Sequence, residues 1–503
     1  MNASEKQQAD ICIILEGTYP YVPGGVSNWT HDLIRRMPEL SFHLLVITPL
    51  EANLKLRYTL PENITGITHI TLQQLPEGRS HIPRAKQFFK DLEESLKNIL
   101  SNGNLMDLAK ILELLKPYQD ILGNHLLLNS RETWEMVVKM YNTQYPASSF
   151  LDYFWSWRSL MSGFYSVLLA EMPPARMYHA VSTGYAGLLA ARAKIETNRP
   201  VILTEHGIYT NERRIEISMS DWFHQKSLGW LNLTNMKKDL KDLWIDTFIN
   251  YSRICYMASD KIITLFPENQ KMQVADGAAL EKLEVIPNGV DYPTYSKIIP
   301  QKPSRPTIAL IGRMVPIKDV KSFILACDIL KRRVPNLLAY LIGPTDEDEI
   351  YYEECREMIN FLGLQDTISC TGRVELTDYM DKIEVNVLTS ISEGQPLVIL
   401  EMGAVGIPSV ATNVGACAEL ILGSEQESPR LKPGGAITPL SNPAKTAKEV
   451  GDLLTDKNWY GQCSLAMKER VHRYYNECDL IERYRGLYDN CLSAHPIPQL
   501  LEG

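Results

Sequence analysis

The chain has 503 residues, which is too long for one ordinary hydrophobic core and therefore predicts two domains. With 45% hydrophobic and 22% charged residues, it has the composition of a soluble globular protein. The 51 basic and 60 acidic residues give a formal net charge of -9, which argues against a dedicated nucleic-acid-binding protein.

The lack of a recognisable targeting segment and the pattern of cysteines both favour a cytoplasmic protein. No apolar run approaches the roughly 20 residues that span a bilayer, and residues 1–10 lack the apolar core of a signal peptide. None of the nine cysteines forms a CxxC pair, and Cys12, Cys327 and Cys370 lie in apolar strand-like or helical contexts. Reduced thiols are therefore expected rather than disulfides or a metal cluster, and the protein is predicted to be cytoplasmic.

The first predicted elements are a strand at residues 11–15, a loop, and an amphipathic helix at 27–37. Gly24 and Gly25 in the loop let backbone amides approach a ligand, and Ser27 is predicted to cap the helix. The same residues also fit a tight turn without a ligand. The chain has no GxGxxG at this point, so a nicotinamide cofactor is not supported.

Further apolar runs in the first half predict parallel strands that are buried on both faces. These runs lie at residues 42–48, 177–181, 201–204, 261–265 and 283–286. Residues from about 74 to 162 favour helix and predict a helical insertion in a first domain at 1–295. His206 follows one of the strands and would face a ligand at its carboxyl end, although a lone histidine there also fits a structural role.

A proline-rich linker is predicted at residues 287–306, before a second series of strands. These strands are expected at 307–312, 337–343, 367–371, 384–389 and 408–412, with helices at 320–333 and 349–362 between them. This second domain covers 305–465, and a C-terminal helix at 468–492, within residues 466–503, would pack back on either domain. The alternation predicts an α/β fold of two doubly wound, Rossmann-like parallel sheets whose carboxyl ends face one cleft.

Two charged loops of the second domain are candidates for binding a donor. Arg313 and Lys318 follow its first strand, and two cations on one loop can neutralise a diphosphate leaving group. An ordinary exposed basic loop fits these residues equally well. The run Asp346-Glu347-Asp348 contains a DxD pattern of the kind that can hold a divalent metal, but a solvated acidic loop is favoured and no metal site is expected.

The segment from Ser392 to Glu401 places two carboxylates, Glu393 and Glu401, around a predicted helix start. Pro396 suits the first turn of that helix, and Gly394 allows close backbone approach. A carboxylate accepts two hydrogen bonds, so one could hold a ribose diol and the other the hydroxyls of a sugar, with a phosphate at the helix start. The spacing alone also fits two solvated glutamates.

Taken with its companions, this segment resembles the retaining glycosyltransferases of family 4, which have the GT-B fold. The companions are Gly312-Arg313, Lys318, residues 287–291 and residues 403–412, in the order typical of that family. Residues 15–27 and 204–209 are more similar still to the cytosolic glycosyltransferases of bacterial Pel exopolysaccharide synthesis. That likeness covers most of the chain, including the helical insertion.

The resemblance implies metal-independent, retaining transfer of a hexose or N-acetylhexosamine from a UDP-sugar to a growing exopolysaccharide chain. It assigns Glu393 to the sugar hydroxyls, Glu401 to the ribose, Arg313 and Lys318 to the diphosphate, and His206 to the sugar near its anomeric carbon. Since no enzymatic nucleophile is evident, it implies front-face attack in which the departing phosphate helps to deprotonate the acceptor.

The likeness also implies roles for further positions. Donor contacts are implied for Gly24, Gly25, Arg373, Val374 and Leu397. Glu205 and Tyr209 would shape the acceptor side, no cofactor is expected beyond the donor, and the implied partner is a membrane-embedded export complex. Two other classes stay open: a non-catalytic UDP-sugar sensor or scaffold, and a UDP-sugar epimerase, for which no acid and base pair can be identified.

Overall fold

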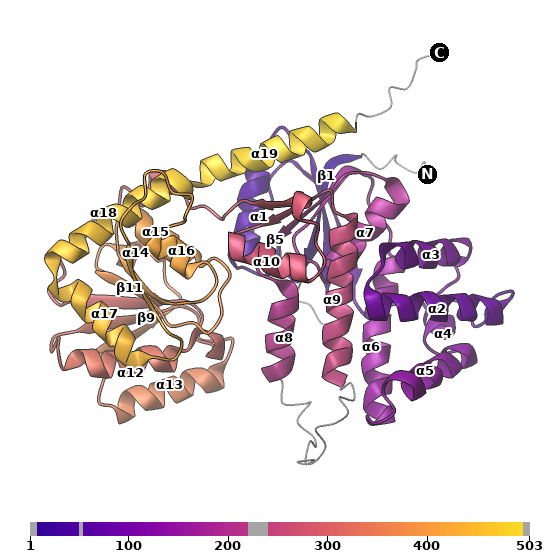
Figure 1. Cartoon of the computed structure of the whole chain (residues 1–503), viewed down its shortest axis with the longest axis horizontal. Helices are drawn as coiled ribbons and strands as arrows, with labels where there is room; N and C mark the ends of the chain where they lie inside the picture. Colours follow the sequence, from indigo (N-terminus) through magenta and orange to yellow (C-terminus); the bar gives the residue numbers. More distant parts are fainter. Residues whose placement is uncertain (1–7, 50–53, 220–239, 496–503) are drawn as a thin grey trace. The chain divides into compact units, whose positions relative to one another are not determined.

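The computed structural model describes residues 8–49, 54–219 and 240–495 of the chain. The chain divides into two compact units, unit 1 with residues 1–285 and 485–503 and unit 2 with residues 286–484 (Figure 1). Each unit contains one parallel sheet with helices on both faces. The predicted doubly wound α/β architecture is thereby confirmed.

The sheet of unit 1 has the strand order β3-β2-β1-β4-β5-β6-β7, and every pairing is parallel. Its strands are β1 (Ala9–Glu16), β2 (Phe42–Thr48), β3 (Ile64–Thr71), β4 (Ala175–Ala180), β5 (Val201–Glu205), β6 (Lys261–Thr264) and β7 (Leu283–Val285). Strand β1 is buried on both faces: Cys12 and Ile14 join the large core cluster, and Ile13 is fully buried between them. This explains why β1 is a continuous apolar run rather than an alternating one.

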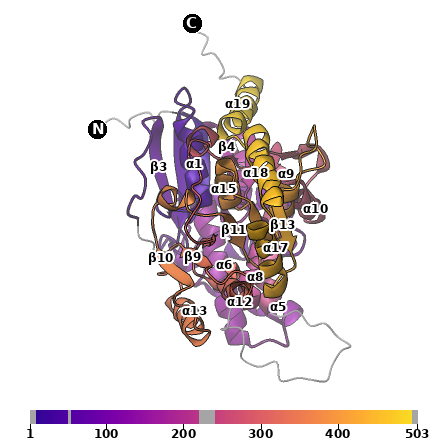
Figure 2. The ribbon, with the colours of Figure 1, turned by 90° about the vertical axis from the view of Figure 1, so that its left-hand side faces the viewer.

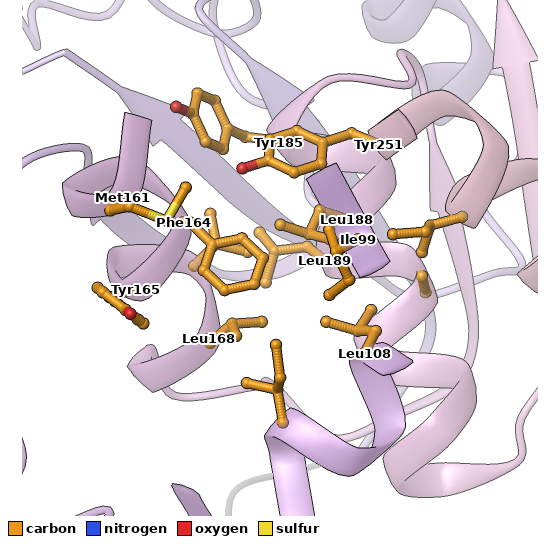
Figure 3. Packing of buried hydrophobic residues seen from close by; sticks show 14 of the residues in the cluster. Ile99, Leu108, Met161, Phe164, Tyr165, Leu168, Tyr185, Leu188, Leu189 and Tyr251 are labelled. Carbon is orange, nitrogen blue, oxygen red and sulfur yellow. The ribbon is translucent and has the colours of Figure 1, made fainter. Parts of the chain in front are cut away.

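Between β3 and β4 lie the helices α2 (Ala85–Asn102), α3 (Leu105–Leu115), α4 (Asn124–Leu127), α5 (Arg131–Gln144) and α6 (Phe150–Leu169). Asn104, Ser130 and Ser149 cap α3, α5 and α6 with their side chains. Figure 3 shows that Ile99 and Phe164 from these helices pack with residues such as Leu188 and Tyr251, so the inserted helices share one core with the sheet.

The remaining helices of unit 1 flank its strands. They are α1 (Gly25–Arg35), α7 (Tyr185–Thr197), α8 (Tyr209–Met219), α9 (Leu240–Ala258) and α10 (Pro267–Ala275), together with a 3-10 turn at Leu280–Lys282. Among the described residues of both units, no helix combines the length and the apolar character needed to cross a membrane.

The sheet of unit 2 has the order β10-β9-β8-β11-β12-β13 and is also parallel throughout. Its strands are β8 (Thr307–Ile311), β9 (Leu338–Ile342), β10 (Ile368–Gly372), β11 (Val385–Leu388), β12 (Ser409–Thr412) and β13 (Gly435–Thr438). Ile308 and Leu310 pack into one core cluster, whereas Ala309 packs into another. This alternation shows that β8 has helices on each side.

The helices of unit 2 are α11 (Tyr292–Tyr295), α12 (Val320–Lys331), α13 (Glu349–Phe361), α14 (Thr377–Met380), α15 (Leu397–Val405), α16 (Cys417–Leu422), α17 (Pro443–Thr455) and α18 (Lys457–Tyr474). Helices α12, α13 and α17 share the cluster that contains Ile308, and α14 and α15 share the cluster that contains Ala309. Figures 1 and 2 both show α12 and α13 side by side.

The prediction of one helix over residues 468–492 is wrong. Helix α18 ends at Tyr474, and a second helix, α19 (Glu477–Ala494), begins three residues later. Between them the backbone pairs with Val290: the Val290 N–H donates to the Tyr475 carbonyl, and the Glu477 N–H donates to the Val290 carbonyl. This backbone pairing interrupts the helix, since those groups are used outside it.

Candidate functional site

The central feature of unit 2 is an ion pair between Lys318 and Glu393. The Lys318 Nζ lies 2.5 Å from Glu393 Oε1, and the side chains are 17% and 11% exposed. The Ser390 hydroxyl donates to the same carboxylate oxygen at 2.5 Å. A largely desolvated pair of this kind is held in one geometry, because either charge alone would be costly to bury.

The loops that carry this pair are joined by backbone-directed hydrogen bonds. Lys318 ends a 3-10 turn (Pro316–Lys318) after β8, and Glu393 lies in the loop after β11. The Thr389 hydroxyl donates to the Lys318 carbonyl at 3.1 Å, and the Ile391 N–H donates to the Ile317 carbonyl at 2.8 Å. Because β8 and β11 are neighbours, both side chains lie at the carboxyl edge of one parallel sheet.

Glu401 lies in α15, whose first residue is Leu397 and whose cap residue is Pro396. Burial raises the pKa of the Glu401 carboxyl to about 7, and the hydroxyl of Tyr295 hydrogen-bonds to it. This residue therefore changes charge near neutral pH. Tyr295 belongs to α11 in the proline-rich segment, beyond the motif at residues 287–291, and no sequence motif includes it.

Gln395 fastens the same proline-rich segment to the loop that carries Glu393. Its Oε1 accepts from the Asn288 N–H at 2.6 Å, and its Nε2 donates to the Asn288 carbonyl at 3.5 Å. Gln395 and Asn288 are both buried, at 7% exposure each. Asn288, which lies in the motif at residues 287–291, is thus hydrogen-bonded to the segment that carries Glu393.

Arg313 forms an ion pair with the acidic run at residues 346–348, which was predicted to be solvated. Its Nη1 lies 2.8 Å from Glu347 Oε2, although the pair is about half exposed. Asp348 caps α13 by accepting from the Tyr351 N–H at 2.9 Å. Asp346 and Glu347 are exposed, as expected of a solvated acidic loop, although Glu347 also pairs with Arg313 and Asp348 caps a helix.

Three glycines stand at the ends of β8, β9 and β10. The Gly312 N–H donates to the Ile342 carbonyl, and the Gly343 N–H donates to the Gly372 carbonyl. A Cβ at Gly343 would overlap the Gly312 carbonyl, so the two backbones approach as only glycine allows. Arg373 and Val374 follow Gly372 at this edge; Arg373 is exposed and Val374 half-buried.

In unit 1 the predicted histidine lies directly after β5. Burial lowers the pKa of His206 to about 4, so its imidazole is neutral at neutral pH. Its Nε2 is buried without a hydrogen-bond partner among the described residues. The ring of Trp29, from α1, meets it edge to face at 4.6 Å between centroids.

Glu205, the neighbour of His206, is only 1% exposed and faces a buried polar network. It accepts from the Tyr256 hydroxyl at 2.9 Å, the Gln273 amide at 2.9 Å and the Tyr209 N–H at 3.2 Å. Desolvation raises its pKa to about 7. Tyr209 in turn donates its hydroxyl to Glu16, at the end of β1, at 2.9 Å. Glu16 lies within the run at residues 15–27, but the sequence assigned it no role in this network.

The start of helix α1, after the glycine loop that follows β1, is not capped as predicted. Helix α1 begins at Gly25 with Gly24 as the cap residue, and no side chain caps it. Ser27 instead donates its hydroxyl to the Val22 carbonyl at 2.5 Å. A Cβ at Gly24 or Gly25 would meet no atom within 4 Å, so packing against the described residues does not require glycine at either position.

The structure therefore gathers the predicted residues in two places. Lys318, Glu393, Glu401 and Leu397 belong to unit 2, with Arg313 and the strand-end glycines at the same sheet edge. His206, Gly24 and Gly25 belong to unit 1 and follow β5 and β1. Unit 2 combines cations with acceptors for hydroxyl groups, which is the chemistry needed to bind a phosphorylated sugar.

Two families match the chain. The family described as "Domain of unknown function (DUF3492)" matches residues 9–281, and the family described as "Glycosyl transferases group 1" matches residues 305–456. The second match contains Arg313, Lys318, Glu393 and Glu401.

Curated relatives are similar over part of the chain. A D-inositol 3-phosphate glycosyltransferase of Paenarthrobacter aurescens (strain TC1) is 31% identical over 162 residues, covering 29% of this chain and 38% of the relative. An MMP alpha-(1->4)-mannosyltransferase of Mycolicibacterium hassiacum is 27% identical over 238 residues, covering 46% of this chain and 52% of the relative. The chain thus spans about half, or less, of the length of these relatives.

A solved structure is similar over nearly the whole length. HepE of Anabaena in complex with UDP has a TM-score of 0.57 and 13% identity, covering 96% of this chain and 100% of HepE. At this identity the likeness establishes the fold alone. The chain belongs to the DUF3492 family and joins its domain to a group 1 glycosyltransferase domain in an α/β fold of the GT-B type.

Proposed function

We propose that the protein is a retaining glycosyltransferase that transfers a hexose or N-acetylhexosamine from a UDP-sugar. The observation that carries this proposal is the Lys318–Glu393 pair at the carboxyl edge of the unit 2 sheet, inside the group 1 glycosyltransferase match. The partial matches to glycosyltransferases and the UDP complex of HepE support a nucleotide-sugar donor.

The chemistry follows from the contacts of this pair. Without donor, Lys318 and Glu393 neutralise each other. An incoming diphosphate competes for the Lys318 ammonium, and the released Glu393 carboxylate accepts hydrogen bonds from the sugar hydroxyls. Arg313 can add a second cation if it leaves Glu347, which the half-exposed geometry of that pair permits at small cost.

In the proposed step, the bond between the anomeric carbon and the diphosphate oxygen breaks as the acceptor oxygen bonds to that carbon. The acceptor proton passes to a diphosphate oxygen, and UDP leaves. Lys318 stabilises the charge that develops on the leaving group. His206 remains neutral and would accept or donate one hydrogen bond to a sugar through Nε2.

The acceptor and the cellular role are proposed from the sequence resemblance. We propose that the acceptor is a growing exopolysaccharide of the Pel type and that a membrane-embedded export complex receives the product. No metal or cofactor is assigned to the transfer itself, because the cationic side chains supply the charge that a diphosphate needs.

The experiment that tests this function is a donor panel. The purified chain is incubated with UDP-glucose, UDP-N-acetylglucosamine, UDP-N-acetylgalactosamine and GDP-mannose, and free nucleoside diphosphate and oligosaccharides are measured by mass spectrometry. One UDP-sugar should be consumed, and Lys318→Met should reduce its turnover at least about 100-fold. Consumption of GDP-mannose alone would refute the UDP assignment. Tight binding of UDP without turnover of any donor would favour a sensor.

A further inference from the structure

The C-terminal helix contributes a tyrosine to unit 1 that contacts a buried histidine. The Tyr488 hydroxyl lies 2.6 Å from His179 Nδ1, although the two residues are 309 positions apart in sequence. The other ring nitrogen of His179 lies 2.8 Å from the Thr204 hydroxyl. Tyr488 and His179 are both fully buried, so these two bonds fix the orientation of the His179 ring.

His179 in turn contacts Trp29, which contacts His206. The ring centroids of Trp29 and His179 are 6.0 Å apart at 90°, and those of Trp29 and His206 are 4.6 Å apart at 75°. Both contacts have the edge-to-face geometry that aromatic rings prefer. The indole of Trp29 is therefore in contact with one histidine whose orientation is fixed and with one whose Nε2 is unpartnered.

His206 depends on these ring contacts more than a hydrogen-bonded histidine would. Its Nε2 has no partner among the described residues, so no bond from that atom sets the ring angle. The Trp29 ring limits where the imidazole can lie. A small displacement of Trp29 would move the nitrogen that is proposed to meet the sugar.

We propose that Tyr488 is a positioning residue for His206, acting through His179 and Trp29. This inference rests on the proposed glycosyl transfer, because it concerns the histidine of that site. It gives the second half of α19 a role in catalysis beyond packing: the hydroxyl of Tyr488 orients His179, and the two aromatic contacts pass that orientation to His206.

The test compares Tyr488→Phe with a matched tyrosine elsewhere in unit 1. Tyr178 is 1% exposed, and its hydroxyl donates to the Pro173 carbonyl at 3.0 Å, so Tyr178→Phe removes one buried hydrogen bond on the face of β4 opposite to His179. Tyr488→Phe keeps the ring that packs against Phe42. It should lower kcat about tenfold with the donor KM within about twofold, while Tyr178→Phe leaves both unchanged.

A double-mutant cycle separates positioning from general loss of stability. In a His206→Ala background, Tyr488→Phe should cause no further loss of kcat, because the group that it positions is already gone. Equal kcat for Tyr488→Phe and Tyr178→Phe, or a full tenfold loss in the His206→Ala background, would overturn the proposal. If Tyr488→Phe fails to fold, Trp29→Phe takes its place in the same cycle with the same expected results.

Crystal structures of the two tyrosine variants give a readout that does not need activity. The rings of Trp29 and His206 should be displaced in Tyr488→Phe and unchanged in Tyr178→Phe. If the wild-type protein consumes no nucleotide sugar, the proposed function fails on its own, and these structures still decide the positioning claim. Unmoved rings in Tyr488→Phe would refute it.

Discussion

Glu401 shows how one residue can make donor binding depend on pH. Burial raises its pKa to about 7, so it is about half protonated at neutral pH before a donor binds. In the proposed donor complex the ribose hydroxyls donate hydrogen bonds to the ionised carboxylate of Glu401, so protonation of that carboxyl should weaken nucleotide binding.

UDP should accordingly bind about tenfold more tightly at pH 8 than at pH 6, since the ionised fraction of Glu401 rises about tenfold between them. Isothermal titration calorimetry measures the two dissociation constants. In the Glu401→Gln variant, the remaining pH dependence of the dissociation constant comes from titration of UDP itself. An identical pH dependence in the wild type and in this variant would exclude Glu401 as the titrating ligand.

The prediction for Glu205 concerns stability, because its carboxyl is buried in a hydrogen-bonded network rather than placed for a ligand. Desolvation raises its pKa from 4.5 to about 7 in the folded protein, so folding favours its protonated form. Its contribution to stability is fully present below pH 4.5 and is lost as the pH rises through 7. The wild type should therefore lose on the order of 3 kcal/mol of unfolding free energy from this group across that window.

The Glu205→Gln variant cannot titrate at this position and should show a flatter dependence of unfolding free energy on pH. Denaturant titrations at pH 5, 6, 7 and 8 measure the difference between the two proteins. Parallel curves would mean that the carboxylate is ionised throughout in the folded state.

At the scale of elements, the loop after β12 supports the loop that carries Glu393. Gly415 has a φ of +51°, and a Cβ there would overlap the carbonyl oxygens of Glu393 and Gly394. The Ala416 N–H also donates to the Gly394 carbonyl at 2.9 Å. The close approach of the two backbones at Gly415 thus holds the loop that carries Glu393 in place.

Gly415→Ala should displace Glu393 and reduce donor turnover at least about tenfold, since small shifts of a positioned group are costly for catalysis. Gly461→Ala is the matched control, because a Cβ there meets no atom within 4 Å in helix α18. Initial rates of both variants measure the effect. Equal rates for the two variants would show that catalysis tolerates movement of the loop that carries Glu393.

Helix α18 is anchored by a buried ion pair that the sequence did not indicate. Arg470 Nε lies 2.5 Å from Glu427 Oε1, with side-chain exposures of 0% and 3%, and the guanidinium also donates to the Ile421 and Lys432 carbonyls. Arg470→Met leaves Glu427 buried without its cation and should cost about 3–5 kcal/mol. Glu427→Gln combined with Arg470→Met should recover part of that loss, as thermal unfolding can measure.

The sequence predicted those elements whose signal is local. Strands β1 and β5 contain unbroken apolar runs at residues 11–15 and 201–203, and β8 with its following cations is recognisable in the same way. Strand β3 is not predicted because it has no unbroken apolar run: Thr65, Thr68 and Thr71 recur at every third position, and most of the strand is only partly buried or exposed. The break between α18 and α19 depends on pairing with the distant Val290. Non-local contacts of this kind leave no pattern in the segment itself.

The residues of the candidate site also differ in whether a local sequence signal points to them. Lys318, Glu393, Glu401 and His206 stand at strand ends or helix starts and could be proposed from motif and spacing. Partners such as Tyr295, Glu347 and Trp29 could not, because each reaches its partner from another segment of the chain through its side chain. The roles of these residues in turnover remain predictions.

At the scale of the whole molecule, each unit has core clusters of its own. The cluster around β1 and the inserted helices lies in unit 1, and the clusters around β8 lie in unit 2. The proposed donor ligands Lys318, Glu393 and Glu401 all belong to unit 2. A nucleotide should therefore stabilise unit 2 rather than both units equally.

Calorimetric scans should resolve this difference. UDP at 100 times its dissociation constant should add about 2.7 kcal/mol and raise the unfolding temperature of unit 2 by roughly 5–10 °C. The Arg470→Met substitution identifies that transition, because it lowers the stability of unit 2 alone. A shift confined to the other transition would place the nucleotide in unit 1.

The measurement that tests the central claim most directly is the initial rate of UDP release from the consumed UDP-sugar. Glu393→Gln, which removes the charge that pairs with Lys318, should fall at least about 100-fold below the wild type. Glu354→Gln, which alters the exposed Lys321–Glu354 pair of the same unit, should keep the wild-type rate. Equal rates for wild type and Glu393→Gln would contradict the assignment of this site to glycosyl transfer.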